Sequence, residues 1–231
     1  MSLVQRDYIL RIIEQFGEVL THVLHLRRGG SAIEARQYID ESIGRLIGME
    51  PDAVYDRSAA ELTGEIRGRL SRHQQPQLVR DQLVVLAGLL HESAHIFDDT
   101  GDADRARADR LKALELYVEV LTVDEPGCVP AEAAIDAILS ELTDDPPPQI
   151  MRQLVVAYET SGRFDDAEDW LFHVLDAMPD DPAALSDGIA FYERLLTLDD
   201  VTLADGGLPE DEALAGLTEL LERQASVPLS S

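Results

Sequence analysis

The sequence has little positive charge and only one cysteine. Its 231 residues include 19 Lys and Arg against 45 Asp and Glu, a formal net charge of −26, and Lys112 is the sole lysine. Non-specific nucleic-acid binding and attraction to an anionic membrane both need clustered positive charge, so we expect neither partner. Cys128 has no second cysteine to pair with, which excludes an intramolecular disulfide and favours a reducing compartment.

Long apolar runs are also missing. No run approaches the roughly 20 residues that a membrane-spanning helix needs, and Arg6, Asp7, Arg11 and Glu14 interrupt the region where a signal peptide would be apolar. We therefore expect a cytoplasmic protein. Hydrophobic residues still make up 45% of the chain, which is enough for a core, so the acidity does not indicate disorder.

The acidic residues are concentrated after the first third of the chain. Residues 1–72 carry a net charge of −1, whereas residues 73–231 carry −25. A polar stretch from Ser71 to Gln77 contains Pro76 and coincides with this change, which favours a boundary there. We predict an N-terminal helical segment at residues 1–72 and a helical repeat region at residues 73–231, with one continuous domain as the alternative.

Apolar residues recur at helical spacing, and no segment alternates as a strand does, which predicts an all-α fold. A wide apolar stripe runs from Ile9 to Leu26, and Gly29 follows it. Ser31–Glu34 and Ser58–Glu61 each have the spacing of a capping box at a helix start. We expect helices over about residues 6–28, 31–48, 58–70, 76–98, 103–121, up to 142, 149–160, 164–178, 182–198 and 209–224, with residues 199–208 as a loop.

The segment from residue 151 to residue 179 resembles a tetratricopeptide repeat. Its matching positions are Leu154 and Tyr158 on the first helix, Gly162 and Phe164 at the turn, Ala167 on the second helix, and Pro179. Met151 stands where Trp is typical, and Val155 where a small residue is typical. A weaker match covers residues 94–113. The resemblance implies antiparallel helical hairpins stacked as an α-solenoid, with the N-terminal helical segment outside the pattern.

The opening of the chain is similar to that of uncharacterised bacterial proteins with repeat-like helices. The similarity lies in Asp-Tyr-Ile-x-Arg-x-Ile-Glu-Gln at Asp7 to Gln15. It implies a fold and no activity.

In tetratricopeptide proteins the first helix of each hairpin lines a groove that binds peptides or partner helices. The resemblance therefore implies a partner groove, and the matching positions are His91, His95, Arg152, Val156 and Glu159. We expect a non-enzymatic protein-interaction module without a cofactor. The acidic residues around its groove either select a basic or amphipathic segment of a partner or only keep the region soluble.

His91, Glu92 and His95 also have the spacing of a zinc hydrolase site. Two imidazoles at i and i+4 stand on one helical face and can bind one Zn²⁺, with the intervening Glu as general base. Glu115 on the following helix is the candidate third ligand. The lack of a predicted strand argues against this site, because zincin hydrolases have a sheet beside the active helix. A zinc-dependent hydrolase stays an alternative function.

The stripe from Ile9 to Leu26 allows a third function class. If subunits bury it between them, the protein is a structural homo-oligomer formed through its N-terminal helices.

Overall fold

The computed structural model describes residues 3–70, 76–122 and 129–226, with side chains described from Glu14 onward and not at Val129 and Pro130. Throughout these ranges the regular structure is helical and no strand occurs, which confirms the predicted all-α fold. Cys128 and residues 71–75 of the polar stretch lie outside the described ranges. The chain divides into two compact units, residues 1–144 (unit 1) and residues 145–231 (unit 2).

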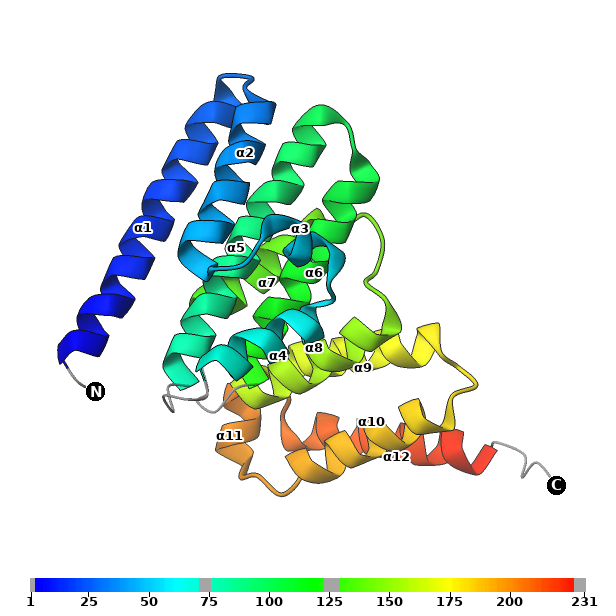
Figure 1. The fold of residues 1–231 in the computed structure, drawn as a ribbon. Coiled ribbons are helices and arrows are strands. Elements are labelled where there is room, and N and C mark those ends of the chain that lie inside the picture. Colours follow the sequence, from blue (N-terminus) through cyan, green and yellow to red (C-terminus); the bar gives the residue numbers. More distant parts are fainter. Residues whose placement is uncertain (1–2, 71–75, 123–128, 227–231) are drawn as a thin grey trace. The chain divides into compact units, whose positions relative to one another are not determined.

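Unit 1 is built around the hairpin of α5 and α6. Its helices are α1 Leu3–Arg28, α2 Ala32–Ser42, the π-helix η1 Ile43–Ile47, α3 Pro51–Asp56, α4 Ala59–Leu70, α5 Pro76–Thr100, α6 Ala103–Thr122 and α7 Val129–Glu141 (Figure 1). The turn between α5 and α6 is made by Gly101, whose φ of +79° suits a residue without a Cβ. Helices α1, α2 and α4 pack against α5, and α7 packs against α6.

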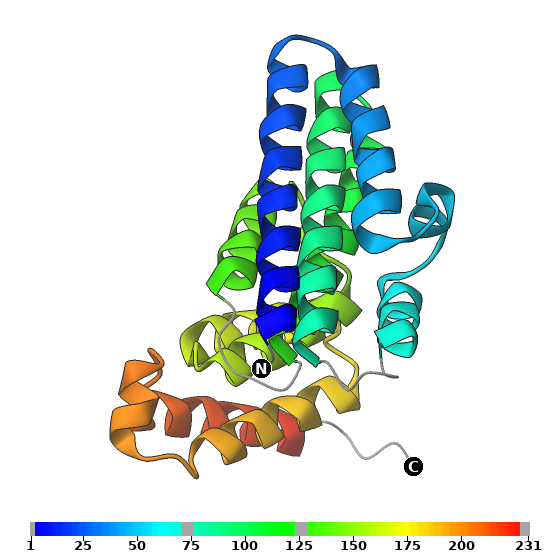
Figure 2. The same cartoon turned by 60° about the vertical axis from the view of Figure 1, so that its left-hand side comes forward.

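Among the described side chains, part of the apolar stripe of α1 is covered within the chain. Val19 and Val23 have no exposed surface, and α1 contacts both α2 and α5. Figure 2 shows α1 and α5 side by side along most of their length. A Cβ added at Gly88 of α5 would lie 2.3 Å from Cζ of Phe16, so the Phe16 ring packs directly on this glycine. This part of the stripe is therefore used in the core of unit 1.

The units do not divide at the predicted boundary between residues 72 and 73. Helices α2 and α4, which precede that point, pack on α5 and α6, which follow it. Arg36 on α2 donates to Ser93 on α5, and Lys112 on α6 donates to the carbonyl oxygens of Val54 and Tyr55. The balance of charged residues in the sequence changes at residue 72, but the helices on either side share one core, so composition does not mark the division.

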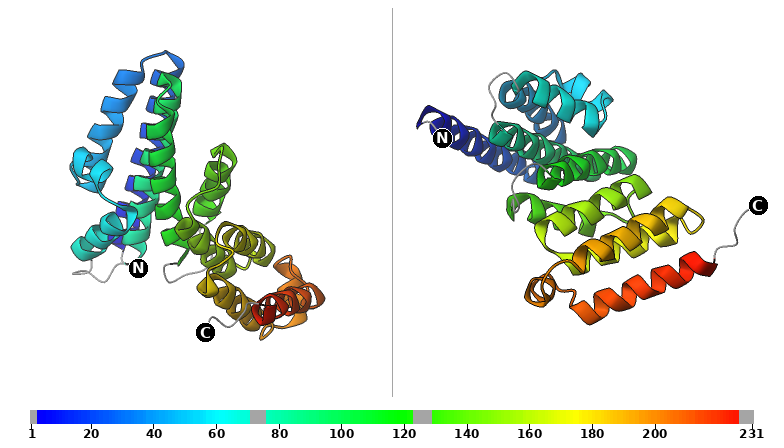
Figure 3. Two further views of the ribbon diagram at one scale, coloured as in Figure 1. Left: turned by 90° about the vertical axis from the view of Figure 1, so that its right-hand side faces the viewer. Right: turned by 90° about the horizontal axis from the view of Figure 1, so that it is seen from below.

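Unit 2 contains two helical hairpins. Its helices are α8 Pro148–Ser161, α9 Phe164–Ala177, α10 Pro182–Leu195, α11 Asp200–Asp205 and α12 Glu210–Ser226. Helix α8 pairs with α9, and α10 pairs with α12 and also contacts α9. The right-hand view of Figure 3 shows α10 and α12 running alongside each other.

The α8–α9 hairpin has the local features that its sequence predicts. Gly162 ends α8 with a φ of +78°, Phe164 is buried at the start of α9, and Ala167 has no exposed surface. The predicted loop at residues 199–208 is wrong, because residues Asp200–Asp205 form α11. Asp199 caps this helix by accepting hydrogen bonds from the backbone N–H groups of residues 201 and 202.

The two predicted capping boxes have different outcomes. Ser58 and Glu61 form one: the Glu61 carboxylate accepts from the backbone N–H and the hydroxyl of Ser58, and Ser58 Oγ accepts from the N–H of Glu61. Ser31 precedes α2 but makes no capping hydrogen bond with its side chain, so the second prediction is wrong. In the described part of the chain, no helix is both long and apolar enough to cross a membrane.

Candidate functional site

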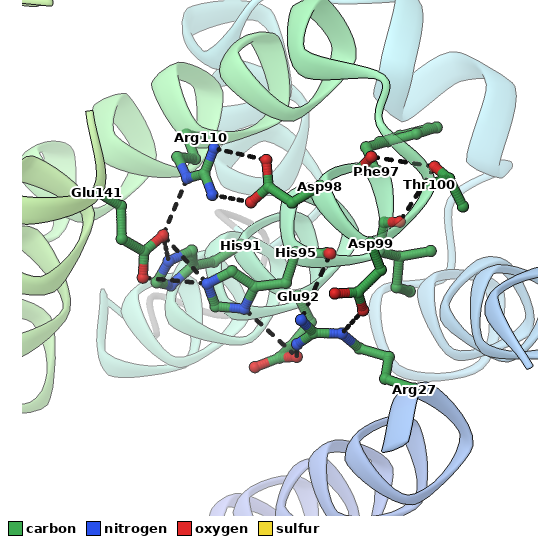
Figure 4. Close-up of polar contacts among 11 residues, drawn as sticks. Arg27, His91, Glu92, His95, Phe97, Asp98, Asp99, Thr100, Arg110 and Glu141 are labelled. Carbon is green, nitrogen blue, oxygen red and sulfur yellow. Dashed lines mark hydrogen bonds and ion pairs between the residues drawn. The ribbon is translucent and has the colours of Figure 1, made fainter. Parts of the chain in front are cut away.

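A cluster of ionisable side chains lies where α5, α6 and α7 meet in unit 1 (Figure 4). His91 and His95 stand one turn apart on α5 and so share a face of that helix. Glu141 ends α7 and faces both rings: its Oε2 lies 3.0 Å from Nε2 of His91, and its Oε1 lies 3.0 Å from Nε2 of His95. Arg110 on α6 donates from Nε to Oε2 of Glu141 at 2.9 Å. We call these four residues the His–Glu cluster.

A second layer of charged groups surrounds the cluster. Arg110 also pairs with Asp98. Glu92 Oε2 lies 3.7 Å from Nδ1 of His95 and 3.2 Å from Nη1 of Arg27, a residue of α1. Arg27 further donates to Asp99 at 2.7 Å. Figure 4 shows Glu92 and Arg27 on the opposite side of the His95 ring from Glu141. The contacts therefore tie α1, α6 and α7 to residues 91–99 of α5.

The surroundings shift the pKa values of the three ligand-type side chains in different directions. Burial lowers the pKa of His91 and outweighs its hydrogen bond to Glu141. The neighbouring carboxylate of Glu92 raises the pKa of His95, although burial opposes it. Burial alone would raise the pKa of Glu141, but hydrogen bonds from Arg110, His91 and His95 outweigh it and bring that pKa to about 2. Glu141 is therefore ionised at neutral pH, and His91 is neutral.

The cluster differs from the predicted zinc site in its third member. Among the described side chains, the acidic group that lies with His91 and His95 is Glu141, and Glu115 is not part of the grouping. Burial raises the pKa of Glu115, and its charged neighbour is Lys112. Glu92 faces Nδ1 of His95, away from the Nε2 atoms, so its position gives no support to the predicted role as general base.

The two histidines are also not on an open groove. Their side chains are 14% and 23% exposed, and both rings are covered by Glu141. The prediction placed His91 and His95 on one hairpin of the groove and Arg152, Val156 and Glu159 on another. The histidines belong to unit 1 and the other three residues to unit 2.

A second candidate site is a pocket in unit 2, which we call the α8–α10 pocket. Its volume is about 290 Å³, and α8, α9 and α10 line it with Arg152, Val155, Val156, Leu171, Val174, Ala184, Asp187, Ala190, Phe191 and Arg194. The lining is apolar apart from two arginines and an aspartate at its rim. Val156 is an exposed hydrophobic residue, with 49% of its surface accessible.

The predicted groove residues of unit 2 gather at this pocket. Arg152 and Val156 line it. Glu159 accepts two hydrogen bonds from Arg194, both of 2.7 Å, and Arg194 lines the pocket. Arg152 is held at the rim by Asp181 and by Asp187, whose Oδ2 lies 3.2 Å from Nη1.

Comparison with known proteins identifies a family but no described function. The model of a family of unknown function, DUF6483, matches residues 3–225. No curated protein and no solved structure matches the sequence.

Proposed function

The chain belongs to the DUF6483 family, and we propose that it is a non-enzymatic interaction module whose α8–α10 pocket binds a basic, amphipathic helix of a partner protein. The main observation that supports the proposal is that the α8–α10 pocket is largely apolar, includes the exposed Val156, and belongs to the strongly acidic unit 2. The likeness of the α8–α9 hairpin to a tetratricopeptide repeat supports it, because the first helices of such hairpins line peptide grooves. A cytoplasmic location is part of the same proposal.

The charge of unit 2 favours a basic partner. Residues 145–231 contain four basic and 19 acidic residues, a net charge of −15. All four arginines are paired with carboxylates: Arg152 with Asp181 and Asp187, Arg163 with Asp166, Arg194 with Glu159, and Arg223 with Glu219. The remaining carboxylates give a negative potential that attracts cationic segments and repels anionic ones.

The size of the pocket favours side chains of a helix over a cofactor. Its volume of about 290 Å³ is at the lower limit of small-molecule sites, which range over about 300–1,000 Å³. An amphipathic helix presents apolar side chains at i, i+3 and i+4, and such side chains can enter a small apolar pocket while the helix covers its rim. Val156 on α8 would then be buried by the partner.

Binding of a synthetic helix tests the proposal. The probe is a fluorescently labelled peptide with Leu at helical spacing and Lys at the other positions, and fluorescence anisotropy measures its affinity for the full chain. The control peptide has the same composition in an order without helical periodicity. We expect the amphipathic peptide to bind more tightly, because only its leucines can enter the pocket together.

Two variants locate the binding. Val156→Asp removes an apolar contact worth about 1.5 kcal/mol or more, so it should weaken binding about tenfold. Val201→Asp is the matched control, because Val201 is also exposed, at 69%, lies in the same unit and is outside the pocket. It should bind at least as well as the wild type. Equal binding of the two peptides, or equal affinity of the two variants, would overturn the proposal.

A further inference from the structure

We infer that His91, His95 and Glu141 form a binding site for one Zn²⁺ ion in unit 1. The inference is independent of the α8–α10 pocket, which belongs to unit 2.

The first support is geometric. One nitrogen of each histidine and one oxygen of Glu141 all lie within 4.8 Å of one another. The two His–Glu contacts are both 3.0 Å. Zinc binds such atoms at about 2.0–2.2 Å, so tetrahedral ligands are separated by about 3.3–3.5 Å. The two His–Glu contacts are shorter than this by a few tenths of an ångström, so an ion can enter when these contacts lengthen and the two histidine nitrogens, which lie within 4.8 Å of each other, adjust around it.

The second support is the chemistry of the donors. Two imidazole nitrogens and one carboxylate oxygen match the ligand set of known three-ligand zinc sites, in which the fourth position is left to water or another ligand. Imidazole favours transition metals over Mg²⁺ and Ca²⁺, which prefer oxygen ligands. The site should therefore select Zn²⁺ over Mg²⁺.

The third support is the outer contact of His95. A metal-binding imidazole commonly donates its other N–H to a carboxylate, which fixes the ring and its tautomer. Glu92 faces Nδ1 of His95 at 3.7 Å, and Arg27 holds that carboxylate from α1 at 3.2 Å. Without a metal, Nε2 of His95 donates to Glu141. When a metal ion replaces that proton, the remaining ring proton is on Nδ1, directed at Glu92, and the Nε2 lone pair binds the ion beside Glu141. We assign Glu92 as a residue that positions His95.

The charges around the cluster also favour a divalent cation. Among the described side chains, the ion pairs of Glu92, Asp98, Asp99 and Glu141 with arginine involve the guanidinium groups of Arg27 and Arg110. With neutral histidines the group therefore carries two excess negative charges, which one Zn²⁺ balances. Arg110 competes for Oε2 of Glu141, but Asp98 offsets its charge and Oε1 is left for the metal.

Isothermal titration calorimetry with ZnCl₂ tests the site. The protein is the untagged full chain, dialysed first against a chelator, in a buffer with excess Mg²⁺ that occupies weak acidic sites. We expect one Zn²⁺ per chain. His91→Ala and Glu141→Gln should each weaken binding by more than ~100-fold, and Glu92→Gln by ~10- to 100-fold.

Two controls remove the same side-chain types elsewhere. His173→Gln replaces a histidine of unit 2 that pairs with Asp145, and Glu115→Gln replaces the carboxylate outside the cluster. Both should bind zinc as the wild type does. Circular dichroism checks that each variant is folded. A wild-type chain that does not bind one Zn²⁺, or a folded His91→Ala chain with unchanged affinity, would overturn the inference.

Cobalt provides a test that needs no variant. Co²⁺ bound in a tetrahedral site of two nitrogens, one carboxylate oxygen and a water has visible absorption bands that octahedral aqueous Co²⁺ lacks at comparable intensity. We expect these bands in the wild-type chain and their loss when one equivalent of Zn²⁺ is added. Their absence would contradict the proposed ligand set.

Discussion

The contact between α10 and α12 in unit 2 allows a stability prediction whose size follows from distances. A Cβ added at Gly216 would lie 2.3 Å from both Cζ and Oη of Tyr192. Tyr192 is fully buried, and its hydroxyl donates to Oε1 of Glu168 at 2.6 Å. Carbon atoms in contact are about 3.5–4.0 Å apart, so in Gly216→Ala the ring or the helix must move by about 1 Å or more.

The expected loss of stability combines three contributions. Forcing a methyl group into a packed core costs about 1–3 kcal/mol. Displacing Tyr192 from its hydrogen bond to Glu168 costs about 1 kcal/mol or more. Alanine favours a helix over glycine by about 1 kcal/mol, which offsets part of the loss. We expect Gly216→Ala to lower the free energy of unfolding of unit 2 by about 2 kcal/mol.

Urea unfolding followed by tryptophan fluorescence measures this change. Trp170 is the only tryptophan of the chain and lies on α9, so its emission reports unit 2. The control is Thr218→Ala, an exposed position on the same helix, where we expect a change within about 0.5 kcal/mol. If Gly216→Ala is as stable as the wild type or more stable, the close packing of α12 on Tyr192 is refuted.

Three further predictions concern α4. Gly64 lies inside this helix with nothing within 4 Å of an added Cβ, so Gly64→Ala should raise the free energy of unfolding in urea by about 0.5–1 kcal/mol. Ser58→Ala removes the capping contact and should lower it by about 0.5–2 kcal/mol, as measured by circular dichroism. Hydrogen bonds from the backbone and side chain of Ser58 lower the pKa of Glu61 from 4.5, so its charged form stabilises the fold above that value. The stability difference between wild type and Glu61→Gln should therefore be present at neutral pH and vanish as the pH falls through the lowered pKa; a difference that grows on acidification would contradict this.

The helices with a continuous apolar face could be predicted from the sequence. Their spacing is a local property, and so is the turn at Gly162, where a positive φ favours glycine. Helices α3 and α11 could not be predicted in this way. Each has six residues and buries a single side chain, Val54 in α3 and Leu203 in α11, so neither has an apolar stripe that distinguishes it from a loop.

The third member of the His–Glu cluster could not be found from spacing. His91 and His95 share one turn of α5, so their proximity is local, but Glu141 follows them by 50 and 46 residues. Its place depends on how α7 packs on α6, which is a tertiary property without a local signal. The same reason applies to the boundary expected at residue 72, because composition cannot reveal that helices on both sides of it share a core.

The most direct test of the proposed function is to locate the bound peptide on the chain by NMR. The measurement is a ¹H–¹⁵N correlation spectrum of the full protein during titration with the amphipathic Leu–Lys peptide. We expect the largest shift changes at the α8–α10 pocket, around Val156, Ala190 and Arg194. Shift changes spread evenly over the acidic surface, or centred outside α8, α9 and α10, would contradict the account.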